Sequence, residues 1–237
     1  MSTPSVCCLM LTADRQRLTD RAVRCFASQT YENSWLLIYD TGAAPYELPR
    51  MLPREISSRI VVVHAQSTAR RTVGTLRNEA IEMAGKAAVI AHWDSDDWSA
   101  PERLAIQVPA LQMHASFRAV GFHNMLFLDA RAGLGRAWEY DHRRGDRAIG
   151  ASLVYWRKTW ERQPFNEAKM VGEDTEWHQI VPTRGLNGVA EPLLIAEVHG
   201  ANTSGVYSVF DNHQPATQPE WRRAPEFDVY CREKLYP

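Results

Sequence analysis

The stretch Ala88-Val89-Ile90-Ala91-His92-Trp93-Asp94-Ser95-Asp96-Asp97-Trp98 places an apolar run directly before three carboxylates. A short apolar run bounded by polar residues predicts a buried strand. The acids then lie at the carboxyl end of that strand, which is the edge where open α/β sheets bind their ligands. Crowded carboxylates repel one another unless a cation lies between them, and Mg²⁺ or Mn²⁺ combines such oxygen ligands with substrate phosphates. The stretch therefore predicts a site for a divalent metal and a diphosphate.

The same residues also allow a purely structural interpretation. Ser99-Ala100-Pro101-Glu102 matches a capping box with a proline near the first helical position. In that interpretation Asp97 only helps to start a helix through its negative charge. The segments around the stretch must decide between the two alternatives.

Strand-like and helix-like patterns alternate through the first hundred residues. Apolar runs at 5–12, 35–39 and 60–64 predict strands, and helical spacing of apolar residues in 15–28 and 75–84 predicts helices. This order predicts an α/β fold with a mostly parallel central sheet flanked by helices. The turn after Thr12, Asp40 and the acids that follow Trp93 all come at carboxyl ends of strands, so we expect them to share one crevice.

The second half is less regular. Residues 119–128, 151–156 and 193–198 predict further strands, and Gly172 leads into a helix that reaches Ile180. Residues 129–147 predict a loop, and its arginines indicate either a mobile acceptor loop or a solvated basic surface; they are Arg131, Arg136, Arg143, Arg144 and Arg147. We expect one domain over 1–237, with a nucleotide-binding half at about 1–100, an acceptor-binding half at about 101–200 and an irregular tail at about 200–237.

Composition excludes several classes of protein. A net charge of −1 gives no general attraction to nucleic acid or anionic membrane. The four cysteines form neither a disulfide framework nor a zinc pattern, and this is typical of a reducing compartment. No signal-like segment and no apolar stretch of transmembrane length occurs. We therefore expect a cytoplasmic protein, and its oligomeric state is not predicted.

Four segments carry a resemblance in their order along the chain. They are SVCCLMLTADR at 5–15; CFASQTY at 25–31 with WLLIYDTG at 35–42; GTLRNEAIEMA at 74–84 with DSDDW at 94–98; and GASLVYWRKTW at 150–160 with VGED at 171–174. Together they resemble the family-2 inverting glycosyltransferases with a GT-A fold. The resemblance implies a metal-dependent enzyme that moves a single sugar from a nucleotide-diphosphate sugar, commonly a UDP-sugar, to an acceptor.

On the donor side, the resemblance implies a set of nucleotide-binding residues. Asp40 would bond to the base and the backbone near Thr12 would line the same pocket, although Asp40 is also a typical turn residue. Arg77 would support the diphosphate or the acidic loop, unless it is only a charge on a helix surface. Asp94 would contact the ribose or the sugar, and Ser95 belongs to the same donor-binding set.

The remaining implied roles are metal ligation and catalysis. Asp96 would be the principal ligand of Mn²⁺ or Mg²⁺, with help from Asp97 and His199, although His199 also fits a structural role. Asp174 or Glu173 would be the general base, unless both only favour a helix N-terminus. Adjacent helical residues point about 100° apart, so one of the two faces the crevice, and we favour Asp174.

Two departures from the family pattern bear on specificity. Ala13-Asp14 stands where the family often has an aromatic residue and an asparagine, which weakens the preference for uridine. The Gln-x-x-Arg-Trp motif of processive synthases is absent, which favours transfer of a single sugar. The acceptor is open among a saccharide, a lipid-linked intermediate, a protein and a modified nucleobase.

Two other functions remain alternatives. A catalytically inactive GT-A-like domain would bind a sugar or a partner without turnover. A nucleotidyltransferase would need a glycine-rich, basic phosphate loop near the N-terminus, and Thr12-Ala13-Asp14-Arg15 is not such a loop.

Overall fold

The computed structural model of the chain describes residues 3–66, 71–113, 116–131, 135–142, 147–190, 192–199, 202 and 218–237. Arg143 and Arg144 of the expected basic tract lie outside the described residues. Within the described residues, no helix has the length and apolar composition needed to cross a bilayer.

The first half alternates strands and helices as the sequence predicts. In chain order these are β1 (Val6–Thr12), α1 (Gln16–Ala27), β2 (Ser34–Asp40), α2 (Arg54–Ser57), β3 (Ile60–His64), α3 (Val73–Glu82) and β4 (Val89–His92). β1 pairs in parallel with β2 and β4, and β2 pairs in parallel with β3. The carboxyl ends of these four strands therefore meet at one edge of the sheet.

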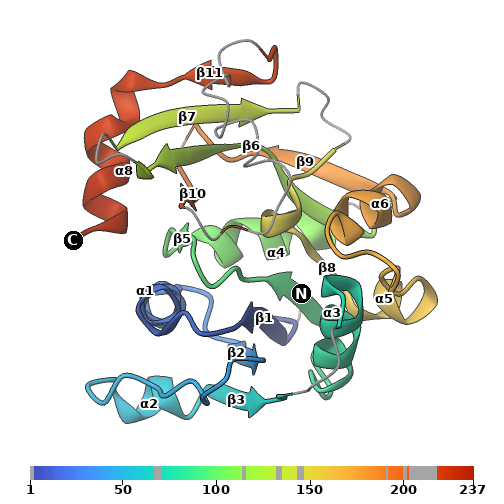
Figure 1. Cartoon of the computed structure of the whole chain (residues 1–237). Helices are drawn as coiled ribbons and strands as arrows, with labels where there is room; N and C mark the ends of the chain where they lie inside the picture. Colours follow the sequence, from blue (N-terminus) through green and yellow to red (C-terminus); the bar gives the residue numbers. More distant parts are fainter. Residues whose placement is uncertain are drawn as a thin grey trace.

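The second half extends the same sheet with mixed pairing. Its elements are β5 (Trp98–Ser99), α4 (Arg103–Met113), β6 (Ala119–Asp129), β7 (Arg136–Asp141), the 3-10 helix η2 (Gly150–Ser152), β8 (Val154–Trp156), α5 (Arg157–Arg162), α6 (Glu173–Ile180), β9 (Thr183–Asn187), β10 (Leu194–Val198), β11 (Trp221–Arg223), the 3-10 helix η5 (Pro225–Phe227) and α8 (Asp228–Leu235). The main path of the sheet runs in the order β11-β7-β6-β8-β4-β1-β2-β3, from the top of Figure 1 to the bottom. Off this path, β9 and β10 pair with β6, and β5 pairs with β10. β8 joins the halves because it pairs antiparallel with both β4 and β6.

Helices cover both faces of the parallel half, which explains why its strands are apolar throughout. Side chains of a strand point alternately to opposite faces. In β1, Cys8 and Met10 pack with apolar residues of α1 and α4. Cys7 and Leu9 pack on the other face with residues of α3, α5 and α6.

Two expectations for the second half are wrong. The tract 129–147 is not all loop, because Arg136–Asp141 forms β7 and pairs antiparallel with β6. The segment from about 200 to 237 is not an irregular tail in its described end, because Trp221–Arg223 pairs with β7 and Asp228–Leu235 is helical. The helix is held by burial of Cys231 and Leu235 against β6, a long-range contact that local sequence pattern does not reveal.

Candidate active site

The carboxyl edge of the parallel strands collects the residues predicted for the donor site. Thr12 and Asp40 end β1 and β2 and are neighbours in the ladder between these strands. β4 ends at His92, so Asp94 and Asp96 follow at the same edge. The topology therefore places these side chains at the edge where the sequence predicts a shared crevice.

Asp40 is buried, and both of its carboxylate oxygens have protein partners. Oδ1 accepts a hydrogen bond from the backbone N–H of Gly42 at 2.9 Å. Oδ2 accepts one from the backbone N–H of Tyr46 at 2.8 Å and lies 3.1 Å from Nδ1 of His64. These bonds are typical of a turn-forming aspartate. Contact between Asp40 and a nucleotide base therefore stays a prediction.

Thr12 and Ser95 are also buried, with 7% and 3% of their surface exposed. The carbonyl oxygen of Thr12 accepts a hydrogen bond from the backbone N–H of Thr41 at 2.9 Å, which ties the ends of β1 and β2 together. In the turn after β1, Asp14 has a positive φ of 52°. Donor contacts by Thr12 and Ser95 remain predictions.

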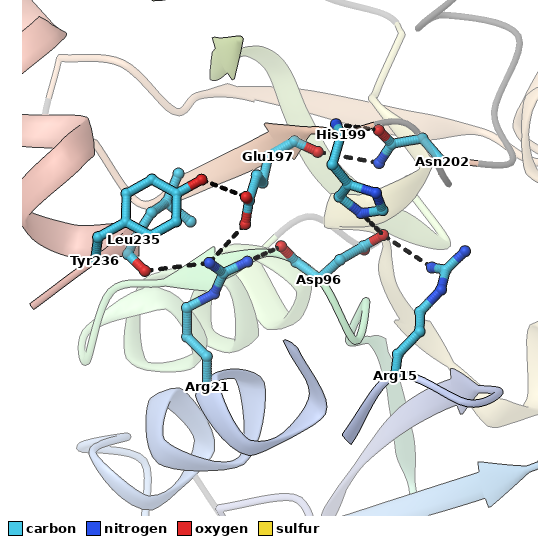
Figure 2. Close-up of polar contacts among 8 residues, drawn as sticks. All are labelled: Arg15, Arg21, Asp96, Glu197, His199, Asn202, Leu235 and Tyr236. Carbon is cyan, nitrogen blue, oxygen red and sulfur yellow. Dashed lines mark hydrogen bonds and ion pairs between the residues drawn. The ribbon is translucent and has the colours of Figure 1, made fainter. Parts of the chain in front are cut away.

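Asp96 lies between two cationic or potentially cationic side chains from distant parts of the chain (Figure 2). Its Oδ2 accepts a hydrogen bond from Nη1 of Arg15 at 3.0 Å and lies 3.1 Å from Nε2 of His199. Arg15 precedes the first turn of α1, and His199 follows β10 directly. The structure thus brings Asp96 and His199 together, as the predicted metal site requires.

Asp97 is in a different environment from Asp96. It is 4% exposed, and neither carboxylate oxygen has a hydrogen-bond partner. Burial, followed by the charges of Asp96 and Asp94, raises its pKa well above the ordinary value. It lies close enough to Cys25 of α1 for its charge to contribute to the raised pKa of that thiol. Ligation of a metal by Asp97 stays a prediction.

The residues present fit a divalent cation that also binds the substrate. Among the described residues, no three His, Cys, Asp or Glu side chains are grouped so that they could hold a metal by themselves. A Mg²⁺-type site needs only one or two carboxylates, because substrate phosphates and water complete the coordination. The oxygen of Asp96 and the imidazole nitrogen of His199 offer such a partial donor set.

Asp94 is influenced by charges of the acidic loop and by charges on α3 and α6. Burial, followed by the charge of Asp96, raises its pKa to about 6. The charge of Arg77 opposes this shift, and the charge of Asp174 contributes to it. Because such charge effects act over short distances in a protein interior, Asp94, Arg77 and Asp174 belong to one electrostatic cluster.

Arg77 and Glu173 form a buried ion pair between α3 and α6. Nε and Nη2 of Arg77 lie 3.0 and 2.9 Å from Oε1 of Glu173. Burial opposes the charge of Arg77, but Glu173, Asp94 and Asp174 outweigh it and raise the pKa of the guanidinium. Glu173 is only 3% exposed. This pairing favours Asp174 over Glu173 as the base, and contact of Arg77 with a diphosphate stays a prediction.

Asp174 is half-buried beside Gly150, at the start of α6. Its Oδ1 accepts a hydrogen bond from the backbone N–H of Thr175 at 2.6 Å. A Cβ at position 150 would overlap Oδ2 of Asp174, so only glycine leaves room for the carboxylate here. The carbonyl oxygen of Gly150 in turn accepts a hydrogen bond from Nδ1 of His92 at 2.8 Å. Burial and then the charge of Arg77 lower the pKa of His92, so this imidazole is neutral.

Sequence reasoning missed Arg15 and Arg21. The sequence position of Arg15 could have identified it, because this residue stands in the turn after β1, at the sheet edge where the acids were expected. No sequence pattern identifies Arg21, which lies in the middle of α1. Its contacts with the Asp96 carbonyl oxygen and with Glu197 join segments far apart in the chain.

The chain matches no protein-family model and no curated protein sequence. Its fold is similar to that of several solved structures. S. aureus TarS 1-349 in complex with UDP superposes with a TM-score of 0.62 at 12% identity, over 82% of this chain and 60% of that one. The complex of TarS 1-349 with UDP-GlcNAc gives a TM-score of 0.60 at 11% identity, over 84% of this chain. This chain thus spans about 60% of the length of those TarS structures.

The mannosyltransferase PcManGT from Pyrobaculum calidifontis, in complex with GDP-Man and Mn²⁺, is also similar. It gives a TM-score of 0.59 at 13% identity, over 100% of this chain and 70% of that one. At such identities the likeness establishes the fold. The chain has the mixed α/β GT-A fold of these glycosyltransferases, and the fold class predicted from the sequence is confirmed.

Proposed function

We propose that the chain is a metal-dependent, inverting glycosyltransferase. It transfers one sugar from a nucleotide-diphosphate sugar to a hydroxyl of an acceptor in a single displacement. Asp174 acts as the general base. The proposal combines the GT-A fold with charged residues at the carboxyl edge of the sheet that suit the donor side and the acceptor side of this reaction.

The observation that carries the proposal is the arrangement of charges at the carboxyl edge of the sheet. Nη1 of Arg15 and Nε2 of His199 lie 3.0 and 3.1 Å from Oδ2 of Asp96. Asp174, at the start of α6, is near enough to Asp94 for its charge to raise the pKa of that carboxyl. A diphosphate leaving group needs positive partners, and an attacking hydroxyl needs a base. The cluster around Asp96 would supply the first, and Asp174 would supply the second.

On the donor side, Asp96 and His199 would hold the divalent cation, which neutralises charge that develops on the diphosphate as the glycosidic bond breaks. The guanidinium of Arg15 lies beside the same carboxylate and is suited to bond to phosphate oxygens. Arg15 would then exchange its bond with Asp96 for bonds to the diphosphate. Both interactions stabilise the leaving group in the transition state.

On the acceptor side, the Thr175 N–H orients the carboxylate of Asp174 through Oδ1. The carboxylate removes the proton of the acceptor hydroxyl while the acceptor oxygen bonds to the anomeric carbon. The bond from that carbon to the diphosphate oxygen breaks in the same step, and its electron pair leaves with the diphosphate. Proton transfer by a positioned carboxylate contributes about 10²–10⁴-fold to such a rate.

The experiment that tests the proposal is calorimetry of the chain with UDP, GDP and their sugars, with and without Mn²⁺. UDP-sugars are tested first, because the family resemblance favours uridine. GDP-sugars are tested as well, because both carboxylate oxygens of Asp40, the residue expected to bond to the base, already have protein partners. Metal-dependent binding of one nucleotide, with slow hydrolysis of its sugar form, is the expected result. Binding without hydrolysis or transfer to any acceptor would favour an inactive domain. No binding of any nucleotide would refute the proposal.

A further inference from the structure

A network of hydrogen bonds around a buried ion pair joins the C-terminal end of the chain to the backbone of Asp96 (Figure 2). Its centre is Arg21, whose side chain is 8% exposed. Nη2 of Arg21 donates to the carbonyl oxygen of Asp96. Nη1 donates to the carbonyl oxygen of Leu235 at 3.2 Å and lies 2.6 Å from Oε2 of Glu197. One guanidinium therefore connects α1, the acidic loop, β10 and the end of α8.

Glu197 carries the network on to His199. The hydroxyl of Tyr236 donates to Oε1 of Glu197. The side-chain amide of Asn202 donates to the carbonyl oxygen of Glu197 at 3.0 Å, and its Oδ1 accepts from the backbone N–H of His199 at 2.6 Å. The main chain of Asp96 is thus bonded to Arg21. The main chain of His199 is bonded through Asn202 to the main chain of Glu197, whose side chain pairs with Arg21.

The burial of Arg21 and Glu197 indicates that their geometry is constrained. Taking an arginine and a glutamate out of water costs several kcal/mol per ion unless close partners compensate. Arg21 donates to two main-chain carbonyl oxygens and Glu197 accepts from the Tyr236 hydroxyl, whereas Nε of Arg21 and Oε2 of Glu197 have no hydrogen-bond partner. The buried pair therefore depends on each of these contacts. Burial and then hydrogen bonding to Glu197 raise the pKa of Tyr236, so its hydroxyl stays protonated and donates.

We propose that Arg21, Glu197 and Tyr236 are positioning residues for the donor site. They hold Asp96 and His199 at the separation that binds the nucleotide diphosphate and its metal. The end of α8, together with Tyr236 directly after it, is therefore part of the donor-binding machinery. This inference rests on the proposed function of the Asp96 site.

The test is Tyr236→Phe, which removes one hydroxyl from a side chain that is 45% exposed and so spares the core. The affinity for Mn²⁺ and for the nucleotide found in the panel is measured by calorimetry. Groups that hold metal ligands in place change metal affinity by about 10–100-fold when they are lost. We expect Tyr236→Phe to weaken Mn²⁺ binding about 10-fold, with a thermal midpoint close to that of the wild type. Glu197→Gln should have a larger effect.

The matched control is Tyr230→Phe, the same change on α8. The ring of Tyr230 stacks edge-on against Trp98, and phenylalanine preserves that contact. This variant should bind Mn²⁺ and nucleotide as the wild type does. If folded Tyr236→Phe and Glu197→Gln both keep wild-type affinities, the network is only structural and the inference is wrong. If Glu197→Gln does not fold, Tyr236→Phe decides alone. If the wild type binds neither Mn²⁺ nor nucleotide, the proposed function fails and this inference fails with it.

Discussion

Gly150→Ala offers the sharpest test of the base assigned to the reaction. The φ of Gly150 lies outside the left-handed region, so alanine is compatible with the backbone there. The new Cβ would nevertheless overlap Oδ2 of Asp174. The backbone has little freedom to retreat, because its carbonyl oxygen is bonded to the buried imidazole of His92. The carboxylate of Asp174 must therefore move.

The size of the effect follows from the geometry. To reach ordinary van der Waals contact the carboxylate must shift by about 2 Å. A displacement of about 1 Å in a reacting group can cost about 10²-fold in rate. We therefore expect kcat to fall about 10²–10³-fold, and nucleotide affinity to stay within about twofold because Asp96 and Arg15 are untouched. The free energy of unfolding should change by at most about 1 kcal/mol, since Asp174 is half-exposed and can rotate.

The assay is the initial rate of sugar transfer, or of donor hydrolysis, at saturating donor. The same change is also made in the Asp174→Asn background, where it should lower the rate less than about threefold because the displaced group is no longer a base. Gly85→Ala is the control: Gly85 has a φ of +57° with open space around it, so the change costs stability and leaves transfer intact. An undiminished rate in Gly150→Ala, or an equal loss in both backgrounds, would refute the role of Asp174.

Three further changes test other parts of the site and fold. Asp96→Ala should weaken Mn²⁺-dependent nucleotide binding at least about 10-fold in calorimetry, because it removes the carboxylate at the centre of the donor site; unchanged binding would show that the metal lies elsewhere. Glu173→Ala leaves Arg77 buried without its partner, so the free energy of unfolding in urea should fall by about 3–5 kcal/mol, and a loss below 1 kcal/mol would argue against the pair. Burial, and then the charge of His178, lower the pKa of His142 from 6.5 to about 4. The folded chain then binds fewer protons than the unfolded chain between these values, so stability falls as the pH drops through this window. Because His142 is partly exposed, we expect a loss of only about 1 kcal/mol between pH 7 and pH 5, absent in His142→Gln; identical urea profiles for the two proteins would contradict this expectation.

The sequence by itself determined the fold class and the edge of the sheet that carries the site. Continuous apolar runs and helical spacing are properties of single segments, so the alternation from β1 to β4 is visible without any knowledge of contacts. The position of Asp94 and Asp96 follows from the same reasoning, because the end of a buried strand can be found from the end of its apolar run. Arg15 was within reach of this rule and was overlooked.

Local pattern was less informative where pairing decides the structure. β7 has no continuous apolar run, and its alternation of aromatic and charged residues covers only Trp138 to Asp141, which is a weak strand signal; pairing with β6 completes the strand. β11 and α8 depend in the same way on β7 and on burial against β6. Elements of this kind are fixed by long-range contacts, which a single sequence does not encode as periodicity.

Only the tertiary structure decided which side chains meet. Asp96 and His199 are 103 positions apart, and Arg77 and Glu173 are 96 apart. Sequence reasoning favours Asp174 over Glu173 as the base, and only the structure shows that Glu173 is paired with the buried Arg77. Sequence reasoning also grouped Asp96 with Asp97 as metal ligands. In the structure the side chain of Asp96 contacts Arg15 and His199, whereas the carboxylate of Asp97 is buried without a hydrogen-bond partner. The physical reason is that a residue's type and its place in an element are local properties, whereas its partner and its dielectric surroundings are set by the packing of distant segments.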